Sequence, residues 1–178
     1  LIGTDLRILD EDSRELPHGV AGEIVSRGRI SMPGYWRRDD ANAEAEYIDA
    51  AGLQWLRSGD IGYVDEEGFL YIVDRKKDMI LSGGQNVYPQ DIEAVLVQHA
   101  QVSDVAVIGI PSARWGESPL ALVVTTAGAT TAEGELLAWA NARLGKQQRL
   151  AELKFVDDLP RNPNGKILKR ELRMQFGE

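Results

Sequence analysis

The sequence contains no cysteine and only two histidines among its 178 residues. Without cysteine there can be no disulfide framework, zinc-thiolate site or cysteine nucleophile, and any metal site would have to rely on carboxylates. Long hydrophobic runs are also missing, since the longest, such as residues 105–110 and 120–124, are far shorter than the roughly 20 residues of a membrane-spanning helix. We therefore expect no transmembrane segment.

Basic residues are outnumbered, with 20 Lys and Arg against 28 Asp and Glu, which gives a net charge of −8. Binding to a phosphate backbone requires a basic surface that releases counterions, so nucleic acid is not an expected partner. The 43% of hydrophobic and 27% of charged residues are typical of a globular protein. The chain begins with Leu1 and has no basic and apolar leader, so we interpret it as a piece of a longer, cytoplasmic protein.

The first part of the chain has the pattern of short strands separated by turns. Apolar segments at residues 6–9, 22–25 and 69–73 are bounded by Gly, Pro, Asp and Ser. The acidic segments 10–13 and 65–68 are typical of hairpin turns, because Asp and Gly tolerate tight backbone angles. Residues 1–73 are therefore predicted to form a small β-barrel or meander.

From residue 74 onward, apolar strands alternate with amphipathic helices, which predicts a second unit of α+β type over residues 74–178. Proline is tolerated at the first position of a helix, and Pro89 is followed by apolar residues at helical spacing. We predict helices over 89–99, 131–144 and 168–176, and strands over 105–110, 120–125 and 155–156. The fold class expected for the whole chain is α+β.

Four segments contain more Gly, Lys, Arg and Asp than a core requires. In the first, residues 56–62, Asp60 lies between two glycines. Its carboxylate could accept hydrogen bonds from both hydroxyl groups of a ribose, or it could be a simple turn residue. The second, residues 74–78, has three cations between two acids. A solvated linker and a hinge between two domains both explain it.

The third segment, residues 81–89, places the pair Gly83 and Gly84 directly before a helix. Either a ligand lies against the bare backbone there, or the pair forms a tight turn. The fourth, residues 160–167, presents Lys166 on a turn-rich loop, where its ammonium suits a phosphate or carboxylate oxygen or is an ordinary surface charge. The sequence contains no nucleotide P-loop and no Gly-x-Ser-x-Gly elbow.

In this order and spacing, the segments resemble the C-terminal part of the adenylate-forming superfamily of acyl-CoA synthetases, peptide-synthetase adenylation domains and luciferase. Arg-Ser-Gly-Asp at 57–60 is similar to the family's Arg-Thr-Gly-Asp, residues 74–93 resemble its hinge and the loop that follows, and Asn-Gly-Lys-Ile at 164–167 resembles its terminal lysine motif. The resemblance implies the end of a large domain with a distorted β-barrel, followed by a mobile lid domain. The lid would contain a β-hairpin, a central sheet and about three helices.

The resemblance also implies an ATP-dependent ligase that joins a fatty or aryl carboxylic acid to CoA. The acid would attack the α-phosphate of ATP and release pyrophosphate, and the CoA thiol would then displace AMP to give a thioester. Position by position, Asp60 would hold the ribose hydroxyls and Arg75 would contact the same nucleotide. Lys166 would be the catalytic residue that reaches the α-phosphate and the acyl carboxylate.

In this family the lid rotates between the two steps, and the pivot corresponds here to Lys77. After rotation, Ser82, Gly83 and Gly84 would line the path of CoA. The family's phosphate loop and acid pocket lie upstream of the matching region, so Mg²⁺ is expected to accompany ATP through that region and the fragment alone is expected to be inactive. No metal ligand is assigned within this chain.

Two other interpretations remain open. The chain could belong to an adenylation domain that loads a carrier protein instead of free CoA, or to a non-catalytic binding module that retains the fold. The presence of Asp60, Arg75 and Lys166 together argues against the second. The identity of the acid and the oligomeric state are not encoded in these residues.

Overall fold

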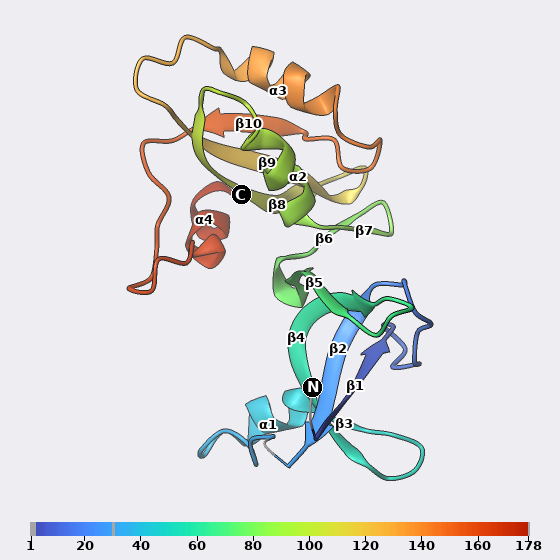
Figure 1. The fold of residues 1–178 in the computed structure, drawn as a ribbon. Helices are drawn as coiled ribbons and strands as arrows, with labels where there is room; N and C mark the ends of the chain where they lie inside the picture. The colour runs from blue at the N-terminus through green and yellow to red at the C-terminus, as the bar shows by residue number, and fades with distance from the viewer. Residues whose placement is uncertain (1–2, 30, 178) are drawn as a thin grey trace. The chain divides into compact units, whose positions relative to one another are not determined.

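The structure, a computed structural model, describes residues 3–29 and 31–177. The chain forms two compact units with their boundary between Lys77 and Asp78, whereas the sequence pattern predicts the change at 73/74. The first unit is built mainly of strands and the second combines strands with helices (Figure 1). The predicted α+β class is confirmed.

The first unit contains an antiparallel sheet of five strands. Its elements are β1 (Thr4–Leu9), β2 (Gly22–Gly28), α1 (Asp39–Ala45), β3 (Glu46–Ile48), β4 (Gln54–Val64) and β5 (Leu70–Arg75). β2 lies between β1 and β4, while β3 and β5 pair with the two ends of β4. Among the described residues these pairings leave β1 at one edge, so the predicted β-rich part is an open antiparallel sheet and not a closed small barrel.

The long strand β4 is not indicated by the sequence pattern, because Gly59 and Gly62 interrupt its apolar residues. In the structure both glycines are required there. Gly59 has a φ of +71°, which L-residues rarely adopt. A Cβ atom on Gly62 would clash with the carbonyl oxygen of Tyr71 on β5. The predicted strands at 6–9, 22–25 and 69–73 correspond to β1, β2 and β5.

The second unit contains a mixed five-stranded sheet. Its elements are β6 (Ile80–Ser82), β7 (Gln85–Val87), α2 (Pro89–Leu96), β8 (Val102–Ser112), β9 (Gly116–Thr125), α3 (Glu133–Asn141), β10 (Glu152–Phe155) and α4 (Lys169–Phe176). β9 lies in the centre of the sheet, antiparallel to β8 and parallel to β10. In the hairpin β6–β7, Ser82 of β6 pairs with Gly116, the first residue of β9. A single turn of 3-10 helix, Lys76–Asp78, connects β5 to β6.

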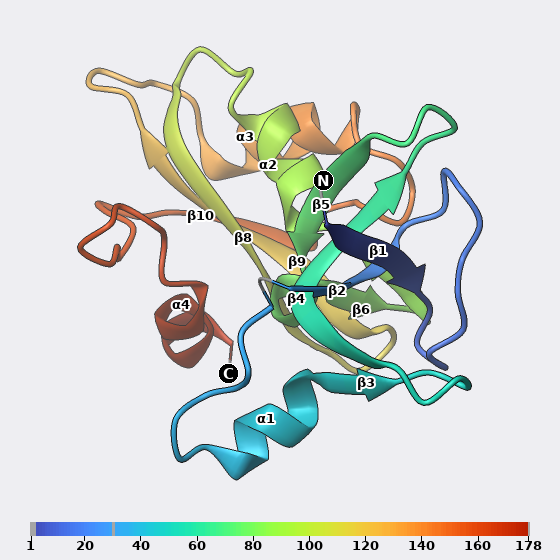
Figure 2. The same cartoon turned by 60° about the horizontal axis from the view of Figure 1, so that its bottom comes forward.

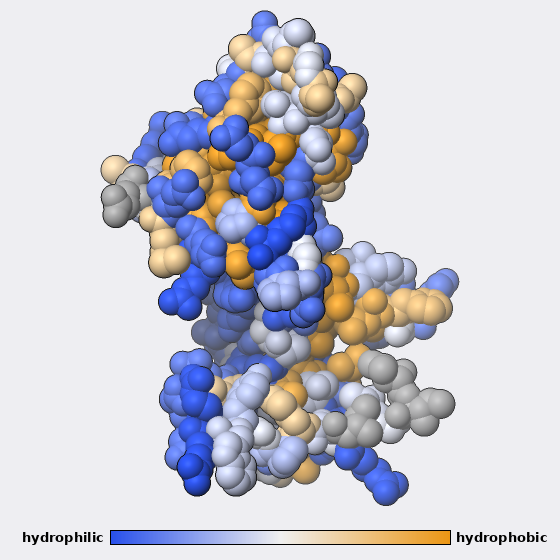
Figure 3. Space-filling model, turned by 90° about the vertical axis from the view of Figure 1, so that its left-hand side faces the viewer, coloured by the Kyte–Doolittle hydropathy of each residue, from blue (hydrophilic) through white to orange (hydrophobic). Residues whose placement is uncertain are grey.

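The core of the second unit follows the alternation of side chains along β8. Val105 and Val107 point into a cluster with residues of α2 and α3, whereas Ala106 and Ile108 point into a cluster with Leu172 of α4. Both faces of the sheet are therefore covered by helices, as Figures 1 and 2 show. The cluster next to α4 is bordered by partly buried residues, and Figure 3 shows apolar side chains between hydrophilic ones on this unit, which occupies its upper part.

The three helices predicted for the second unit are present, with shorter limits. α2 ends at Leu96 because the amides of Gln98 and His99 donate to carbonyl groups three residues earlier, which closes the helix in tighter turns. None of the helices in the described part of the chain has both the length and the apolar character needed to span a membrane.

Candidate functional site

Asp60 and Arg75 face each other across strands β4 and β5, where the pairing register makes them direct partners. The Nε atom of Arg75 lies 2.7 Å from Oδ1 of Asp60. The Asp60 side chain is 24% exposed and that of Arg75 is 52% exposed, so both reach the surface. The hairpin thus brings together the two residues for which the resemblance implies contact with a nucleotide.

The backbone around Asp60 is held by a bulge in β4. Val25 of β2 pairs with Arg57 and Glu23 pairs with Ile61, so β4 has extra residues between these two pairs. The hydroxyl of Ser58 donates to the carbonyl oxygen of Ile24 at 2.8 Å and accepts the amide of Asp60 at 3.0 Å. Bulges re-aim side chains at functional sites, and this one fixes the direction in which Asp60 projects.

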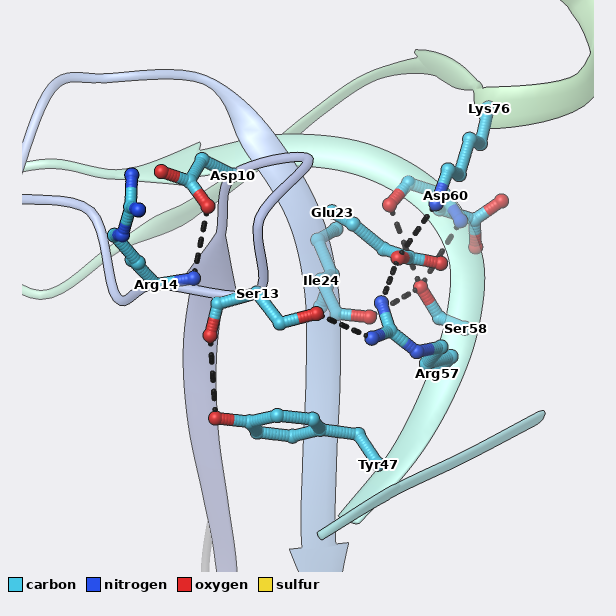
Figure 4. A network of polar contacts seen from close by, with 10 residues as sticks. All are labelled: Asp10, Ser13, Arg14, Glu23, Ile24, Tyr47, Arg57, Ser58, Asp60 and Lys76. Atoms are coloured by element: carbon cyan, nitrogen blue, oxygen red, sulfur yellow. Dashed lines mark hydrogen bonds and ion pairs between the residues drawn. The ribbon is translucent and has the colours of Figure 1, made fainter. Parts of the chain in front are cut away.

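Next to this bulge lies a buried carboxylate to which the sequence analysis assigned no role. Glu23 is 5% exposed and forms ion pairs with Arg57 and with Lys76, whose Nζ atom lies 2.9 Å from Oε2 (Figure 4). Arg57 also donates to the hydroxyl of Ser13 at 2.7 Å. A buried charge requires such partners, because an unpaired one is costly to desolvate. Lys76 is thereby tied to β2.

Lys77 lies between two anchored residues. On its N-terminal side, Lys76 is bound to Glu23 of the first unit. On its C-terminal side, Asp78 accepts a hydrogen bond of 2.8 Å from Nη2 of Arg173 on α4 in the second unit. Within the described residues, the side chain of Lys77 has no hydrogen bond or ion pair. Among the described residues, the side chain of Lys77 is therefore bound to neither unit, although both of its neighbours are.

The glycine pair forms the two-residue turn of the hairpin β6–β7. Gly83 and Gly84 have φ values of +59° and +76°, as tight hairpin turns require. A Cβ atom on Gly83 would lie 2.9 Å from the ring of Trp115, and the Gly83 amide donates to the Trp115 carbonyl at 2.7 Å. At Gly84, no heavy atom of the described residues lies within 4 Å of the place that a Cβ would take, so this residue is open.

Beside this hairpin the second unit has a pocket of about 550 Å³. Ser82, Gly83 and Trp115 line one side, and the loop between α3 and β10 contributes Lys146 and Arg149. Its volume is within the range of small-molecule sites, and it combines an aromatic ring with two cations. The sequence did not indicate Trp115, Lys146 or Arg149, since residues far apart in the chain form this pocket.

Lys166 is exposed on the loop between β10 and α4. The side-chain oxygen of Asn162 accepts the amides of Asn164 and Lys166 at 3.1 and 2.9 Å, and Gly165 has a φ of +80°. Among the described residues, the ammonium of Lys166 has no hydrogen bond or ion pair, so it is free to bind a ligand. Within the second unit, this loop and the glycine hairpin lie at different edges (Figures 1 and 2).

The structure therefore places Asp60 and Arg75 together, Ser82, Gly83 and Gly84 on one hairpin, and Lys166 on a separate loop. The described residues contain no group of three or more His, Asp or Glu side chains that could hold a metal ion. An expected Mg²⁺ thus has no evident ligand set in the described part of the chain.

Comparison with known proteins matches residues 91–166 to the family of AMP-binding enzyme C-terminal domains. The chain is 44% identical over 173 residues to a 2-succinylbenzoate–CoA ligase of Geobacillus kaustophilus, covering 97% of this chain and 34% of that protein. It is 41% identical to a fatty acid–[acyl-carrier-protein] ligase of Streptomyces coeruleorubidus, covering 98% of this chain and 33% of that protein.

Among solved structures, the ATP-bound MatB of Rhodopseudomonas palustris superimposes with a TM-score of 0.90 at 37% identity, covering 100% of this chain and 35% of that chain. The chain thus spans about a third of the length of the relatives it matches. It belongs to the adenylate-forming superfamily, and residues 91–166 are its AMP-binding enzyme C-terminal domain.

Proposed function

We propose that the chain is the C-terminal part of an ATP-dependent acid–CoA ligase and provides residues for both of its steps. The observation that carries this proposal is the distribution of the polar residues. Asp60 and Arg75 form a fixed pair in the first unit, whereas Lys166 and the glycine hairpin occupy different edges of the second. One unit can thus hold a nucleotide while the other presents two different groups to it in turn.

In the first step, a carboxylate oxygen of the acid attacks the α-phosphorus of ATP, and the bond to pyrophosphate breaks. The Asp60 carboxylate would accept hydrogen bonds from the ribose hydroxyls, with Arg75 fixing its orientation and contacting the same nucleotide. Lys166 would stabilise the charge that develops on the α-phosphate oxygens. Its exposed ammonium supports this role, because among the described residues no internal ion pair has to break first.

In the second step, the CoA sulfur attacks the acyl carbonyl carbon, and the bond to AMP breaks. Ser82, Gly83 and Gly84 would line the path of the pantetheine arm, where the open backbone at Gly84 leaves room for a chain of methylene and amide groups. The pocket beside them supports the same assignment. Trp115 offers a stacking surface, and Lys146 and Arg149 offer partners for phosphate groups.

The change between the two steps requires a pivot, for which we propose Lys77. Its neighbours Lys76 and Asp78 are bound to opposite units, so rotation about the backbone of Lys77 would move one unit without disturbing either ion pair. Such a hinge absorbs the change in one or two dihedral angles.

A carrier-bound thiol is the alternative acceptor. The relative from Streptomyces coeruleorubidus, a fatty acid–[acyl-carrier-protein] ligase, favours this alternative. Lys146 and Arg149, which line the pocket beside the glycine hairpin, favour free CoA. Their positive charges could bind the phosphates on the ribose of CoA, and a carrier-bound arm has no such ribose phosphates. The cytoplasmic location and the accompanying Mg²⁺ stay predictions.

The decisive experiment separates the half-reactions in the longer protein that contains this chain. ATP–pyrophosphate exchange with a panel of fatty and aryl acids would report adenylate formation. Thioester formation with CoA and with a carrier-bound thiol would then be compared from the same acyl-adenylate. Exchange with at least one acid, followed by thioester formation with CoA, is the expected result. Absence of exchange with all acids would favour a non-catalytic module.

For the 178-residue chain by itself we propose no adenylation activity. The family resemblance implies that the phosphate loop and the acid pocket lie upstream of the matching region. Pyrophosphate release by the isolated chain in the presence of ATP and acid would contradict this. The longer protein serves as the positive control in the same assay.

A further inference from the structure

The loop that presents Lys166 packs against the sheet through Leu159 and Ile167 and is also connected to it through the side chain of Arg161. Nη1 of Arg161 donates to the carbonyl oxygen of Gly165 at 2.6 Å. Nη2 of the same guanidinium forms an ion pair with Oδ2 of Asp104 on β8. Arg161 thus joins the residue directly before Lys166 to a strand that is more than fifty positions earlier in the sequence.

Asp104 is directed toward this loop by a local irregularity in β8. The pairing of β8 with β9 shifts between Val102 and Asp104, which marks a β-bulge. The other carboxylate oxygen, Oδ1, accepts the amide of Val105 at 3.0 Å and so fixes the carboxylate on its own strand. Bulges next to functional sites commonly re-aim one side chain, and here the re-aimed side chain is an acid.

The backbone of the loop is held by its own hydrogen bonds and by this attachment. The amide of Asn162 donates to the carbonyl oxygen of Lys166 at 2.9 Å, and the amide of Leu168 donates to that of Pro160 at 2.7 Å. Asn162 accepts two amides from inside the loop, which shapes the turn but does not attach it to the sheet. Gly165 has a positive φ, and no heavy atom of the described residues lies within 4 Å of where a Cβ would be. The contact from Arg161 to the Gly165 carbonyl therefore adds a link to β8 on the peptide directly before Lys166, beside the hydrogen bonds that Asn162 makes within the loop.

We propose that Asp104 is a positioning residue for Lys166 and acts through Arg161. Asp104 holds the guanidinium, the guanidinium holds the Gly165 carbonyl, and the carbonyl fixes the peptide that carries Lys166. This inference rests on the proposed function, because it assigns Lys166 to the adenylate-forming step. Asp104 lies outside the motif that contains Lys166, so the motif by itself does not indicate it.

Because the Arg161–Asp104 ion pair is exposed, its effect on the rate can be measured separately from its effect on the free energy of unfolding. The side chains of Arg161 and Asp104 are 42% and 33% exposed, and ion pairs at such positions contribute little to folding. A misplacement of about 1 Å in a catalytic group, in contrast, can cost up to about a hundredfold in rate. Loss of the pair should thus affect rate much more than the free energy of unfolding.

The test compares Asp104→Ala, Arg161→Ala and the double variant in the longer protein. We expect each to lower kcat of adenylate formation on the order of tenfold with a smaller change in KM for ATP. Thioester formation from added acyl-adenylate should stay within about twofold of wild type, because Lys166 is not used in that step. The double variant should be no slower than Arg161→Ala, since the two residues act in series.

Two further variants sharpen the comparison. Arg161→Lys keeps the charge but lacks the planar guanidinium whose two nitrogens contact Gly165 and Asp104. Its rate of adenylate formation should therefore be close to that of Arg161→Ala. The matched control is Glu152→Ala, which breaks the similarly exposed ion pair with Lys154 within β10 and removes no contact of Arg161. It should leave both half-reactions as in wild type.

Hydrogen exchange of the peptide covering residues 162–168 provides a readout that does not depend on activity. Asp104→Ala should raise exchange in this peptide and leave β9 protected. Unchanged exchange, wild-type adenylation in Asp104→Ala, or equal losses in both half-reactions would overturn the inference. A wild-type protein without adenylation would instead overturn the proposed function, and the exchange comparison would still decide whether Asp104 holds the loop.

Discussion

The two units of this protein are stabilised in different ways. In the second unit, apolar side chains fill both faces of the sheet, with Leu122 at 0% exposure on one face and Leu136 at 0% on the other. In the first unit, a small apolar cluster of Leu9, Val25 and Trp55 lies beside buried or partly buried carboxylates.

Charged groups do much of the local ordering in the first unit. Glu23 binds two cations, and Asp49 accepts hydrogen bonds from the Leu53 amide and from the Trp55 indole at 2.9 and 3.0 Å. The comparison indicates that the second unit can present chemical groups on loops without involving its core. In the first unit, the candidate site and the stabilising ion pairs share the same strands.

The largest expected effect on a rate comes from removing the exposed lysine of the second unit. Lys166→Ala should slow adenylate formation on the order of 10²–10³, as for other groups that stabilise transition-state charge. Because the ammonium has no partner among the described residues, the free energy of unfolding should change by no more than about 0.5 kcal/mol. Exchange of pyrophosphate into ATP and chemical denaturation measure the two quantities. A rate within about threefold of wild type would remove Lys166 from the proposed step.

The opposite test damages the core of the second unit and leaves its loops alone. Leu122→Ala removes a fully buried side chain next to α4 and should destabilise this unit by about 2–5 kcal/mol. Leu122→Met, which keeps the volume, should cost less than about 1.5 kcal/mol. Denaturation followed by circular dichroism gives both values. Equal stability of the two variants would show that the side chain is not packed as described.

The junction between the units offers a third test. Lys77→Pro fixes φ near −65° and should spare adenylate formation while lowering thioester formation by about tenfold or more. Single-turnover measurements of each half-reaction in the longer protein report the two effects. Lys77→Ala, which retains a flexible backbone, should lose less than the proline variant. Parallel losses in both half-reactions would argue against Lys77 as the pivot.

The smallest effect concerns the charges of the first unit. The hydrogen bond from the Leu53 amide, aided by Trp55, Ala51 and the Arg7 guanidinium, lowers the pKa of Asp49 below its usual value, against the opposing effect of burial. A lowered folded-state pKa stabilises the fold fully above the unfolded value of about 3.9. That stability is lost as the pH falls through the folded-state pKa.

Asp49→Asn should therefore be less stable than wild type at neutral pH, and the difference should shrink as the pH falls below about 4. Denaturation of both proteins across this range, followed by tryptophan fluorescence, measures the difference. A difference independent of pH would mean that the ionised carboxylate does not stabilise this turn. As a control, Leu122→Met in the apolar core of the second unit removes no ionisable group, so its effect on stability should not depend on pH over the same range.

Much of the architecture follows from local patterns. Continuous apolar runs identify β8 and β9, and helical spacing after Pro89 identifies α2, because hydrophobicity and propensity act over a few residues. The motif at 164–167 likewise identifies Lys166 before any contact is known. Strand β4 is the exception, since its two glycines are explained only by the bulge and by the approach of β5.

Residue types and motif spacing were enough to indicate the class of fold, the family resemblance and Asp60, Arg75 and Lys166 as candidate residues. That Arg75 pairs with Asp60, that Glu23 anchors Lys76 and that Asp104 reaches Arg161 became evident only in the folded chain. The physical reason is that motifs and periodicity are properties of neighbouring residues. An ion pair between distant positions depends on strand register and bulges, which only the folded chain fixes.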